Sequence, residues 1–407
     1  MRLYGPSLHA LALYALAAVL GLAIAPPRTT AADLPEIVIG APIALTGGFG
    51  EGGQRVVEGM QVAISEINEQ GGIKALGGAR LKLITADSSS NNPTQASSVT
   101  RRLAEEDKAV VLVGAHASGM TLSAQVEAER AQVPIITTSY ADSIVTRGYH
   151  YTFKLVPQVS TMFGAMLDYS VDMMKASGAD PNRIAVVVGS DAGSQDMARV
   201  VAKMAADRHL TLLTTVTYPS NLTDATPVVS AMLQNKPALV LMSGFTSDVI
   251  LLVRTLRNVG LTMPITTLSG SISNDSVGAS LGKAAEGFMG VVSWNWDLPI
   301  DGEKAFIERY HHDFPNRPYP PAAETLGEGY AIGWLIKAGL EKAGSADPKK
   351  LRDALASLTI PSVLPGKPIA FDDKGLNTGL VPVLVTWIDG ELRTIWPQQY
   401  QTTKPRL

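Results

Sequence analysis

The 407-residue sequence contains no cysteine. This absence excludes a disulfide framework, a thiol nucleophile and a lipidated N-terminal cysteine. Charge is also scarce, because charged residues make up 17% of the chain and the 34 basic and 37 acidic residues give a formal net charge of −3. A basic nucleic-acid-binding surface needs an excess of lysine and arginine, so we expect no nucleic-acid partner.

Several short motifs of catalysis and cofactor binding are missing as well. The sequence has no Gly-x-Ser-x-Gly elbow, no phosphate-binding loop that ends in Lys-Ser or Lys-Thr, and no His-Glu-x-x-His pair. The six histidines follow no metal-ligand pattern. The stretch TGGFGEGG at residues 46–53, which we expect to form a glycine-rich loop, lacks a lysine and the acidic residue expected of a dinucleotide site. We therefore expect no enzyme, no cofactor and no metal site.

The long hydrophobic run of the sequence lies near the N-terminus. Arg2 precedes the run LHALALYALAAVLGLAIA at residues 8–25, which ends at Pro26-Pro27. This arrangement is typical of an export signal, and we place the cleavage after Ala32. An uncleaved membrane anchor is the alternative, because the run is just long enough to span a bilayer. With cleavage, residues 1–32 are a signal peptide and the mature protein is periplasmic and not embedded in the membrane.

The rest of the sequence alternates short apolar runs with helical patterns. Residues 109–114 and 133–138 have the length of buried strands, and residues 119–132 between them have the apolar spacing of a helix. The same alternation runs from residue 36 to 138 and restarts from 151 to 268. We therefore predict an α/β protein with two doubly wound parallel-sheet lobes.

The C-terminal third departs from this alternation. Helical patterns at 303–313, 324–343 and 348–358 follow one another without strands, and we expect these helices to pack on the first lobe. A last strand pair meets at Asp389-Gly390, a hairpin signal, and we expect it to return to the second lobe. Two lobes joined by several chain crossings predict a hinged clamp with a ligand cleft between the lobes.

The turns after neighbouring parallel strands meet at one sheet edge, where open α/β sheets bind small ligands. The turn His116-Ala117-Ser118 leads into the N-terminus of a helix, where unpaired N–H groups favour a carboxylate. The alternative role of Ser118 is that of a simple N-cap. His116 either donates to a ligand carboxylate or closes the strand end.

Several segments together resemble one family. They are IVIGAPIALTGGFGEGGQRVVEGMQVAISEINEQGG, LITADSSSNNP, VVLVGAHASGMT, RIAVVVGSDAGSQDMAR, LVRTLRNVGL and AFDDKG. They closely resemble the type I periplasmic solute-binding proteins of ABC importers, in the leucine/isoleucine/valine-binding branch, and the resemblance covers residues 35–395. It implies a three-stranded hinge, with crossings near residues 154–157, 293–297 and 378–381.

The resemblance also implies domain boundaries and a function. Lobe 1 would comprise residues 33–154 plus 296–378, and lobe 2 residues 155–295 plus 379–407. The protein would be a monomeric, non-catalytic receptor that binds a small-molecule ligand and delivers it to the permease of an ABC transporter. A ligand-sensing receptor of the same fold that controls a partner protein is the alternative.

Site residues follow from the same resemblance. Ser118 matches the serine that binds the α-carboxylate of the ligand together with neighbouring main-chain amides. Ser139 and Ala141 lie in the loop whose carbonyl and hydroxyl groups receive the carboxylate and the ammonium, and Phe245 matches an aromatic wall residue. The complete predicted set of ligand-binding residues is Ser118, Ala117, His116, Ser139, Ala141, Phe49, Phe245, Gly270 and Trp294.

Three positions depart from the family pattern. Two tyrosines of the family correspond to Gly52 and Gly193, and the acidic residue that pairs with the α-ammonium corresponds to Gly270 or Ser271. A buried ammonium without a carboxylate costs several kcal/mol, so this loss argues against an ordinary α-amino acid unless another acid replaces it. The candidate replacements, each of which is alternatively a solvated helix residue, are Asp248, Glu324 and Glu328.

The small residues are expected to enlarge the cleft. Phe49, Trp294 and Trp296 lie near its predicted rim or hinge, where aromatic faces can stack on a planar ligand. The alternative is that Trp294 and Trp296 alternate along a strand with one of them in the core. Amino acids, aromatic carboxylates, short dicarboxylates and amides all stay open as ligands.

Overall fold

A computed structural model describes residues 35–405, apart from 191, 220 and 221. The predicted signal peptide, residues 1–32, lies outside the described residues. Across the described ranges, no helix is both long and apolar enough to cross a membrane.

The first sheet is entirely parallel and has the strand order β2-β1-β3-β4-β5. Its strands are β1 (Glu36–Ile43), β2 (Arg80–Asp87), β3 (Val111–Val113), β4 (Ile135–Thr137) and β5 (Thr152–Lys154). The helices packed around it are α1 (Gly50–Glu69), α2 (Pro93–Glu105), α3 (Ser118–Ala131), α10 (Glu303–Asp313), α11 (Glu324–Ala343) and α12 (Pro348–Ala356).

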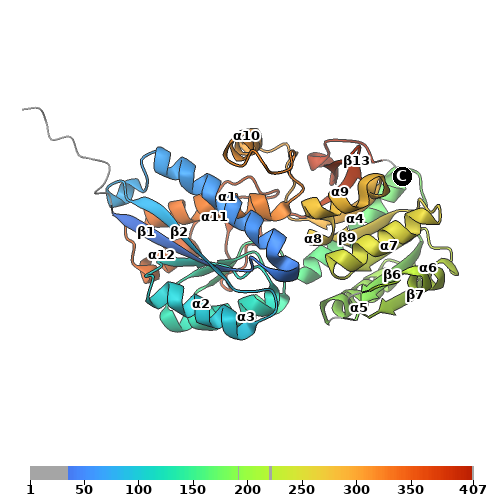
Figure 1. Cartoon of the computed structure of the whole chain (residues 1–407), viewed down its shortest axis with the longest axis horizontal. Coiled ribbons are helices and arrows are strands. Elements are labelled where there is room, and N and C mark those ends of the chain that lie inside the picture. Colours follow the sequence, from blue (N-terminus) through green and yellow to red (C-terminus); the bar gives the residue numbers. More distant parts are fainter. Residues whose placement is uncertain (1–34, 191, 220–221, 406–407) are drawn as a thin grey trace, which may run out of the picture. The chain divides into compact units, whose positions relative to one another are not determined.

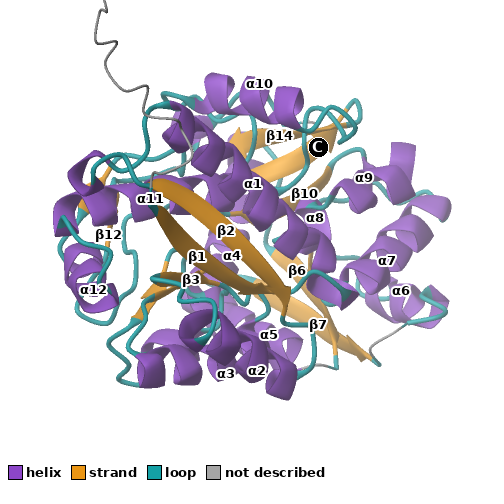
Figure 2. Ribbon diagram, turned by 60° about the vertical axis from the view of Figure 1, so that its left-hand side comes forward, coloured by secondary structure: helices purple, strands orange, loops and turns teal. Residues whose placement is uncertain are grey.

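The alternation of side chains along the strands explains why helices cover both faces of this sheet. Val111 and Val113 pack into the same core as α1 and α11, whereas Leu112 between them packs into the core that α2 and α3 share. Figures 1 and 2 show α1 and α11 on one side of β1 and β2, and α2 and α3 on the other. The prediction that helices from the C-terminal third pack on the first lobe is confirmed.

The second sheet has the order β14-β13-β10-β9-β8-β6-β7, in which β13 and β14 form an antiparallel edge on five parallel strands. Its strands are β6 (Arg183–Gly189), β7 (Thr211–Tyr218), β8 (Leu239–Ser243), β9 (Ile265–Leu268), β10 (Phe288–Val292), β13 (Val383–Ile388) and β14 (Glu391–Trp396). Its helices are α4 (Val159–Ala176), α5 (Ala192–Asp207), α6 (Thr226–Leu233), α7 (Thr246–Asn258), α8 (Gly270–Ser273) and α9 (Asp275–Leu281).

Both faces of this second sheet are also covered. Ile184 and Val186 pack with α4 and α5, whereas Ala185 and Val187 pack in the core with α6 and α7. The prediction of two doubly wound α/β lobes is therefore confirmed. The short helices α8 and α9 and a two-stranded sheet of β11 (Thr359–Ile360) and β12 (Ile369–Ala370) were not predicted.

The hairpin between β13 and β14 forms where the sequence predicts it. Asp389 has φ of 53° and Gly390 has φ of 83°. A two-residue turn with positive φ at both positions matches the twist of the flanking strands, and Asp-Gly is a preferred pair for it.

The glycine-rich segment at residues 46–53 differs from the prediction. We expected a loop up to Gly53, whereas a short 3-10 helix η1 (Gly47–Phe49) leads directly into α1, which begins at Gly50. A Cβ atom on Gly53 would lie 1.8 Å from the carbonyl oxygen of Ala44. The glycines here allow the helix to pack directly on the end of β1, and they do not make the segment a loop.

The chain passes between the two sheets three times. The connecting segments are residues 155–158, between β5 and α4, residues 293–302, between β10 and α10, and residues 371–382, between β12 and β13. Each overlaps one of the three crossings that the sequence predicts.

Candidate functional site

The candidate residues lie at the carboxyl ends of parallel strands. The order of the first sheet reverses at β1 and β3, and that of the second sheet reverses at β6 and β8. Open α/β sheets bind ligands beside such reversals. Phe49 follows β1, the turn 116–118 follows β3, and Phe245 follows β8. The topology thus selects the same loops that the sequence analysis selects.

Ser118 is half-buried and is the first residue of α3. The N-cap residue is Ala117, which offers no side-chain cap, so the alternative role of Ser118 as an N-cap is wrong. Ser118 Oγ instead accepts a hydrogen bond from the N–H of Ala141 at 3.2 Å, which joins the loops after β3 and β4. Within the described residues, the N–H groups of Ser118 and Gly119 have no hydrogen-bond partner. This helix N-terminus therefore keeps two donors for an anion.

His116 occupies the space beside Gly52. A Cβ atom on Gly52 would lie 2.5 Å from Nε2 of His116. Thr138 Oγ1 lies 3.2 Å from Nδ1 of the imidazole, and the ring of Phe49 meets it edge-on at 6.0 Å. Burial lowers the pKa of His116 to about 4, so the ring is neutral at neutral pH. The space that Gly52 was expected to add to the cleft is therefore filled by the neutral imidazole of His116.

Ser139 is fully buried and its polar atoms are already engaged. Its hydroxyl donates to the carbonyl of His116 at 2.6 Å and lies 2.5 Å from Oγ1 of Thr121. Its carbonyl accepts a hydrogen bond from Nζ of Lys154. Ser139 thus positions the loop after β4, and its hydroxyl faces no solvent.

Trp294 lies in the core and not at a cleft rim. Its side chain is 0% exposed, it packs against Phe306 at 5.9 Å, and its Nε1 donates to Glu303 at 3.1 Å. Because β10 ends at Val292, Trp294 and Trp296 do not alternate along a strand. Trp296 is half-buried and donates to the carbonyl of Leu392 at 2.8 Å.

The candidate residues of the second sheet form a separate group. Phe245 precedes α7, and Gly270 begins α8. Thr246 Oγ1 donates to the carbonyl of Gly270 at 3.5 Å, which joins the two loops. Phe245 and Phe49 are 42% and 43% exposed, so each sheet contributes one exposed aromatic side chain next to its order reversal.

The three candidate replacement acids are not solvated. Asp248, Glu324 and Glu328 are 1%, 1% and 0% exposed, so the alternative of a solvated helix residue is wrong for all three. Asp248 accepts a hydrogen bond from the N–H of Leu222 at 3.0 Å. Burial of Glu324 and Glu328 explains why the pKa of each carboxyl is raised.

Glu324 and Glu328 join loops of both sheets at one chain crossing. Glu324 accepts hydrogen bonds from the hydroxyl of Ser269, after β9, from the N–H of Ser293 at 2.9 Å and from the hydroxyl of Tyr140 at 3.0 Å. Glu328 accepts from the Ser293 hydroxyl at 2.5 Å, while its Oε2 has no hydrogen-bond partner in the described part of the chain. The neighbouring carboxyl of Glu324 adds to the burial that raises the pKa of Glu328. These acids hold the crossing together.

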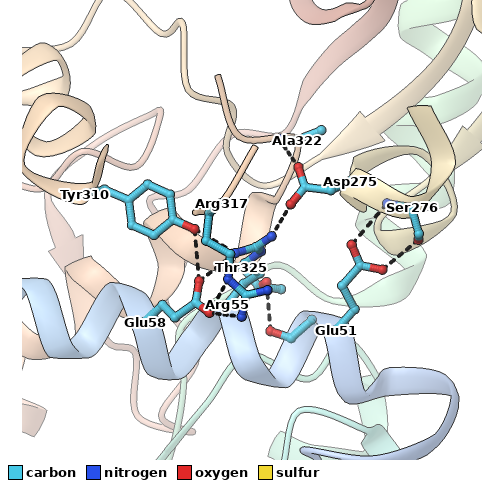
Figure 3. A network of polar contacts seen from close by, with 10 residues as sticks. Glu51, Arg55, Glu58, Asp275, Ser276, Tyr310, Arg317, Ala322 and Thr325 are labelled. Carbon is cyan, nitrogen blue, oxygen red and sulfur yellow. Dashed lines mark hydrogen bonds and ion pairs between the residues drawn. The ribbon is translucent and has the colours of Figure 1, made fainter. Parts of the chain in front are cut away.

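A second buried network joins α1 to α9 (Figure 3). Arg55, on α1, is 3% exposed and donates to Glu58 at 2.6 Å, to the hydroxyl of Tyr310 at 2.7 Å and to Asp275, the first residue of α9. Burial alone would lower the pKa of Arg55, but the negative charge around it holds that pKa above its ordinary value. Because α1 packs on the first sheet and α9 on the second, this ion pair links the two lobes.

Two further contacts extend this interlobe network. The hydroxyl of Ser276 donates to Glu51 at 2.6 Å, and the N–H of Ala322 donates to Asp275 at 2.9 Å. Both contacts join residues of α9 to segments that pack on the first sheet (Figure 3). The carboxylate of Asp275 is thus held from two directions.

Two surface hollows lie away from these residues. One of about 500 Å³ lies between residues 296–301 and α10, and one of about 690 Å³ lies beside Trp387. Neither is lined by a predicted ligand-binding residue. Over the ranges that the structure describes, no three histidine, aspartate or glutamate side chains gather in a way that could hold a metal ion.

The roles of Lys154 and Arg55 were not predicted from the sequence. Lys154 lies in the apolar run FKLV, and a lone charge in a buried-strand pattern signals an internal partner. Arg55 and Glu58 are three residues apart on α1, a spacing that allows a pair, but Asp275, the other acidic partner of Arg55, is 220 positions away. No pattern in the sequence near Arg55 predicts that partner.

Comparison with known proteins gives one family and several relatives. The family model described as "Periplasmic binding protein" matches residues 36–384. The Leu/Ile/Val-binding protein homolog 8 of Brucella suis biovar 1 is 23% identical over 404 residues, which cover 96% of this chain and 97% of the relative.

Two solved structures share the fold. The branched-chain amino acid transporter substrate binding protein LivJ from Streptococcus pneumoniae, in complex with isoleucine, aligns with a TM-score of 0.76 and 20% identity over 89% of this chain and all of its own. An ABC transporter solute binding protein from R. palustris, in complex with benzoate, aligns with a TM-score of 0.74 and 19% identity over 88% of this chain and 95% of its own.

Proposed function

Because the chain belongs to the periplasmic binding protein family, we propose that it is a solute-binding protein that closes over one small carboxylate-bearing molecule and delivers it to the permease of an ABC importer. The observation that carries the ligand class is the N-terminus of α3. Its N–H groups at Ser118 and Gly119 are unpaired within the described residues, and its N-cap Ala117 supplies no side-chain acceptor. A carboxylate satisfies such donors and is favoured by the helix dipole.

The proposed site combines loops from both sheets. Ser118, Ala117, His116 and Ala141 form its first side with Phe49 at the edge, and Phe245 and Gly270 form the opposite side. Ser139 positions this site from behind, and Trp294, which is buried in the core, is left out of it.

The lobes of the proposed clamp are residues 33–154 plus 296–378 and residues 155–295 plus 379–407. The ligand would shift an open-to-closed equilibrium in proportion to its preference for the closed form. The contacts of Asp275 with Arg55 and of Ser269 with Glu324 join the two lobes and support a closed arrangement. Relatives named for leucine, isoleucine and valine, and a structural neighbour that holds benzoate, support acids of this size.

The test is a thermal-shift screen of residues 33–407, expressed without the proposed signal peptide. The panel contains leucine, isoleucine, benzoate, succinate and acetamide. A ligand that binds only the folded state raises the melting temperature by mass action, and we expect the shift from carboxylates and not from the amide.

A pair of serine variants locates the binding. Ser118→Ala should weaken the carboxylate-induced shift, whereas Ser143→Ala, at an exposed position of the next loop, should leave it unchanged. A shift that acetamide also produces, or one that Ser118→Ala does not reduce, would contradict the assignment of the carboxylate to α3.

A further inference from the structure

The loops at the end of the first sheet have donors to spare but few free acceptors. The carbonyl of His116 receives the Ser139 hydroxyl at 2.6 Å, and the carbonyl of Tyr140 receives the N–H of Val159 at 2.8 Å. The carbonyl of Ser139 receives Nζ of Lys154. By contrast, the N–H groups at the start of α3 are unpaired within the described chain. Each of these carbonyls already accepts one hydrogen bond, so a ligand ammonium would have to share it with that donor.

Lys154 donates the hydrogen bond that the carbonyl of Ser139 accepts. It is the last residue of β5, and its side chain is 0% exposed. Its backbone N–H donates to Gly375 at 2.7 Å, and its carbonyl accepts from Asn377 at 2.9 Å, so the strand end is fixed against a chain crossing. Its side chain therefore has little freedom to leave the Ser139 carbonyl.

The charges around Lys154 come from two elements besides its own. Asp142, after β4, and Glu328, on α11, both favour its charged form, and its Nζ lies 5.9 Å from the centre of the Tyr140 ring. Burial opposes them and lowers the pKa of Lys154 to about 7. An apolar side chain would fill this place without that desolvation cost, so the amine of Lys154 occupies it against a penalty.

The α-ammonium and the carboxylate of an amino acid are joined through a single carbon atom. If the carboxylate binds at the start of α3, the ammonium must find acceptors in the adjoining loops. The loop after β4 adjoins α3, because Ala141 donates to Ser118 there at 3.2 Å. Its carbonyl at Ser139 is the one that Lys154 occupies.

We propose that Lys154 is a specificity-determining residue: its ammonium holds the Ser139 carbonyl in place of a ligand amine, so the site selects carboxylates that carry no α-amine. This inference rests on the proposed function and narrows its ligand class. Lys154 acts as a positioning residue, because its buried side chain orders the acceptors and does not reach the ligand itself.

The test compares acids that differ only in the α-ammonium. The pairs are 4-methylpentanoate with leucine and 3-phenylpropanoate with phenylalanine, each titrated by calorimetry into the full mature chain. An unpaired ammonium at the site should weaken binding, so we expect the acid of at least one pair to bind at least about tenfold more tightly than its amino acid.

Variants assign this selectivity to Lys154. Lys154→Met keeps an unbranched side chain one atom shorter and frees the Ser139 carbonyl, so the ratio of the two affinities should fall at least about tenfold. Lys154→Arg retains the cation and should keep the preference for the acid. Lys175→Met, on the exposed surface of α4, is the matched control and should change neither affinity. If Lys154 only stabilised the fold, Lys154→Met would weaken the binding of both members of a pair equally.

Each outcome of these titrations either supports or overturns the inference. Equal or tighter binding of the amino acid by the unmodified protein overturns the inference but leaves the proposed function standing, and so does a ratio that Lys154→Met does not change. If Lys154→Met does not fold, the ratio measured on the unmodified protein still decides. If none of the four probes binds at millimolar concentration, the proposed carboxylate specificity fails and the inference fails with it.

Discussion

The buried ion pair between Arg55 and Asp275 offers the sharpest test of how the two lobes are held. Asp275→Asn removes one charge while it keeps the size of the side chain and an oxygen for the N–H of Ala322. Arg55 then stays buried at 3% exposure with Glu58 as its remaining charged neighbour. Removing one partner of a buried pair costs 3–5 kcal/mol, and because Glu58 remains we expect about 3 kcal/mol.

Urea unfolding followed by circular dichroism measures this loss of stability. Glu51→Gln is the matched control, because it weakens another contact between α1 and α9 whose partner Ser276 is exposed. That contact should contribute less than about 1 kcal/mol. Small-angle X-ray scattering should in addition give a larger radius of gyration for Asp275→Asn than for Glu51→Gln, since the ion pair joins elements of different lobes.

Similar losses of stability in Asp275→Asn and Glu51→Gln would contradict this prediction. Equal losses would mean that the guanidinium of Arg55 is satisfied by Glu58 and Tyr310 alone. An unchanged radius of gyration with a loss of about 3 kcal/mol would mean that the pair stabilises the fold without favouring closure.

Two further predictions concern stability. The unfolded state takes up a proton on His116 below its ordinary pKa of 6.5, whereas the folded state does so only below about 4. As the pH falls from 6.5 to 4, the free energy of unfolding of the unmodified protein should therefore fall by about 3 kcal/mol more than that of His116→Gln. Urea titrations of both proteins at the two pH values measure this difference, and equal losses would contradict a buried neutral ring. A Cβ atom on Gly59 would lie 2.1 Å from the carbonyl oxygen of Leu326 where α1 crosses α11, whereas one on Gly119 would meet nothing within 4 Å. In thermal unfolding, Gly59→Ala should lower the stability by more than about 2 kcal/mol, whereas Gly119→Ala should be neutral or slightly stabilising. Equal effects of the two substitutions would show that α1 and α11 separate easily.

The strands and helices could be predicted because their apolar spacing reports which side of each element is buried. Along β6, successive residues enter two different cores, so the whole strand appears as an unbroken apolar run. Gly53 was misassigned to a loop for the opposite reason. Its role depends on the carbonyl of Ala44, and the spacing within the segment does not reveal that contact.

The candidate site was predicted only at the level of its loops. Ser118 and Ala141 do meet, because parallel strands end at the same sheet edge. The sequence left open whether Glu324 and Glu328 are buried or solvated, although they lie four residues apart within the glycine-rich and apolar segment 324–340. Nothing local shows that the hydroxyl of Tyr140, far away in sequence, lies within hydrogen-bond distance of both.

The position of the terminal hairpin in the second sheet bears on how the chain matures. β13 pairs with β10 on one side and with β14 on the other, so the sheet needs residues 383–396 to cover the edge of β10. A chain still being synthesised or exported lacks these residues and exposes that edge. The second sheet can therefore be completed only after residues 383–396 are available to cover the edge of β10.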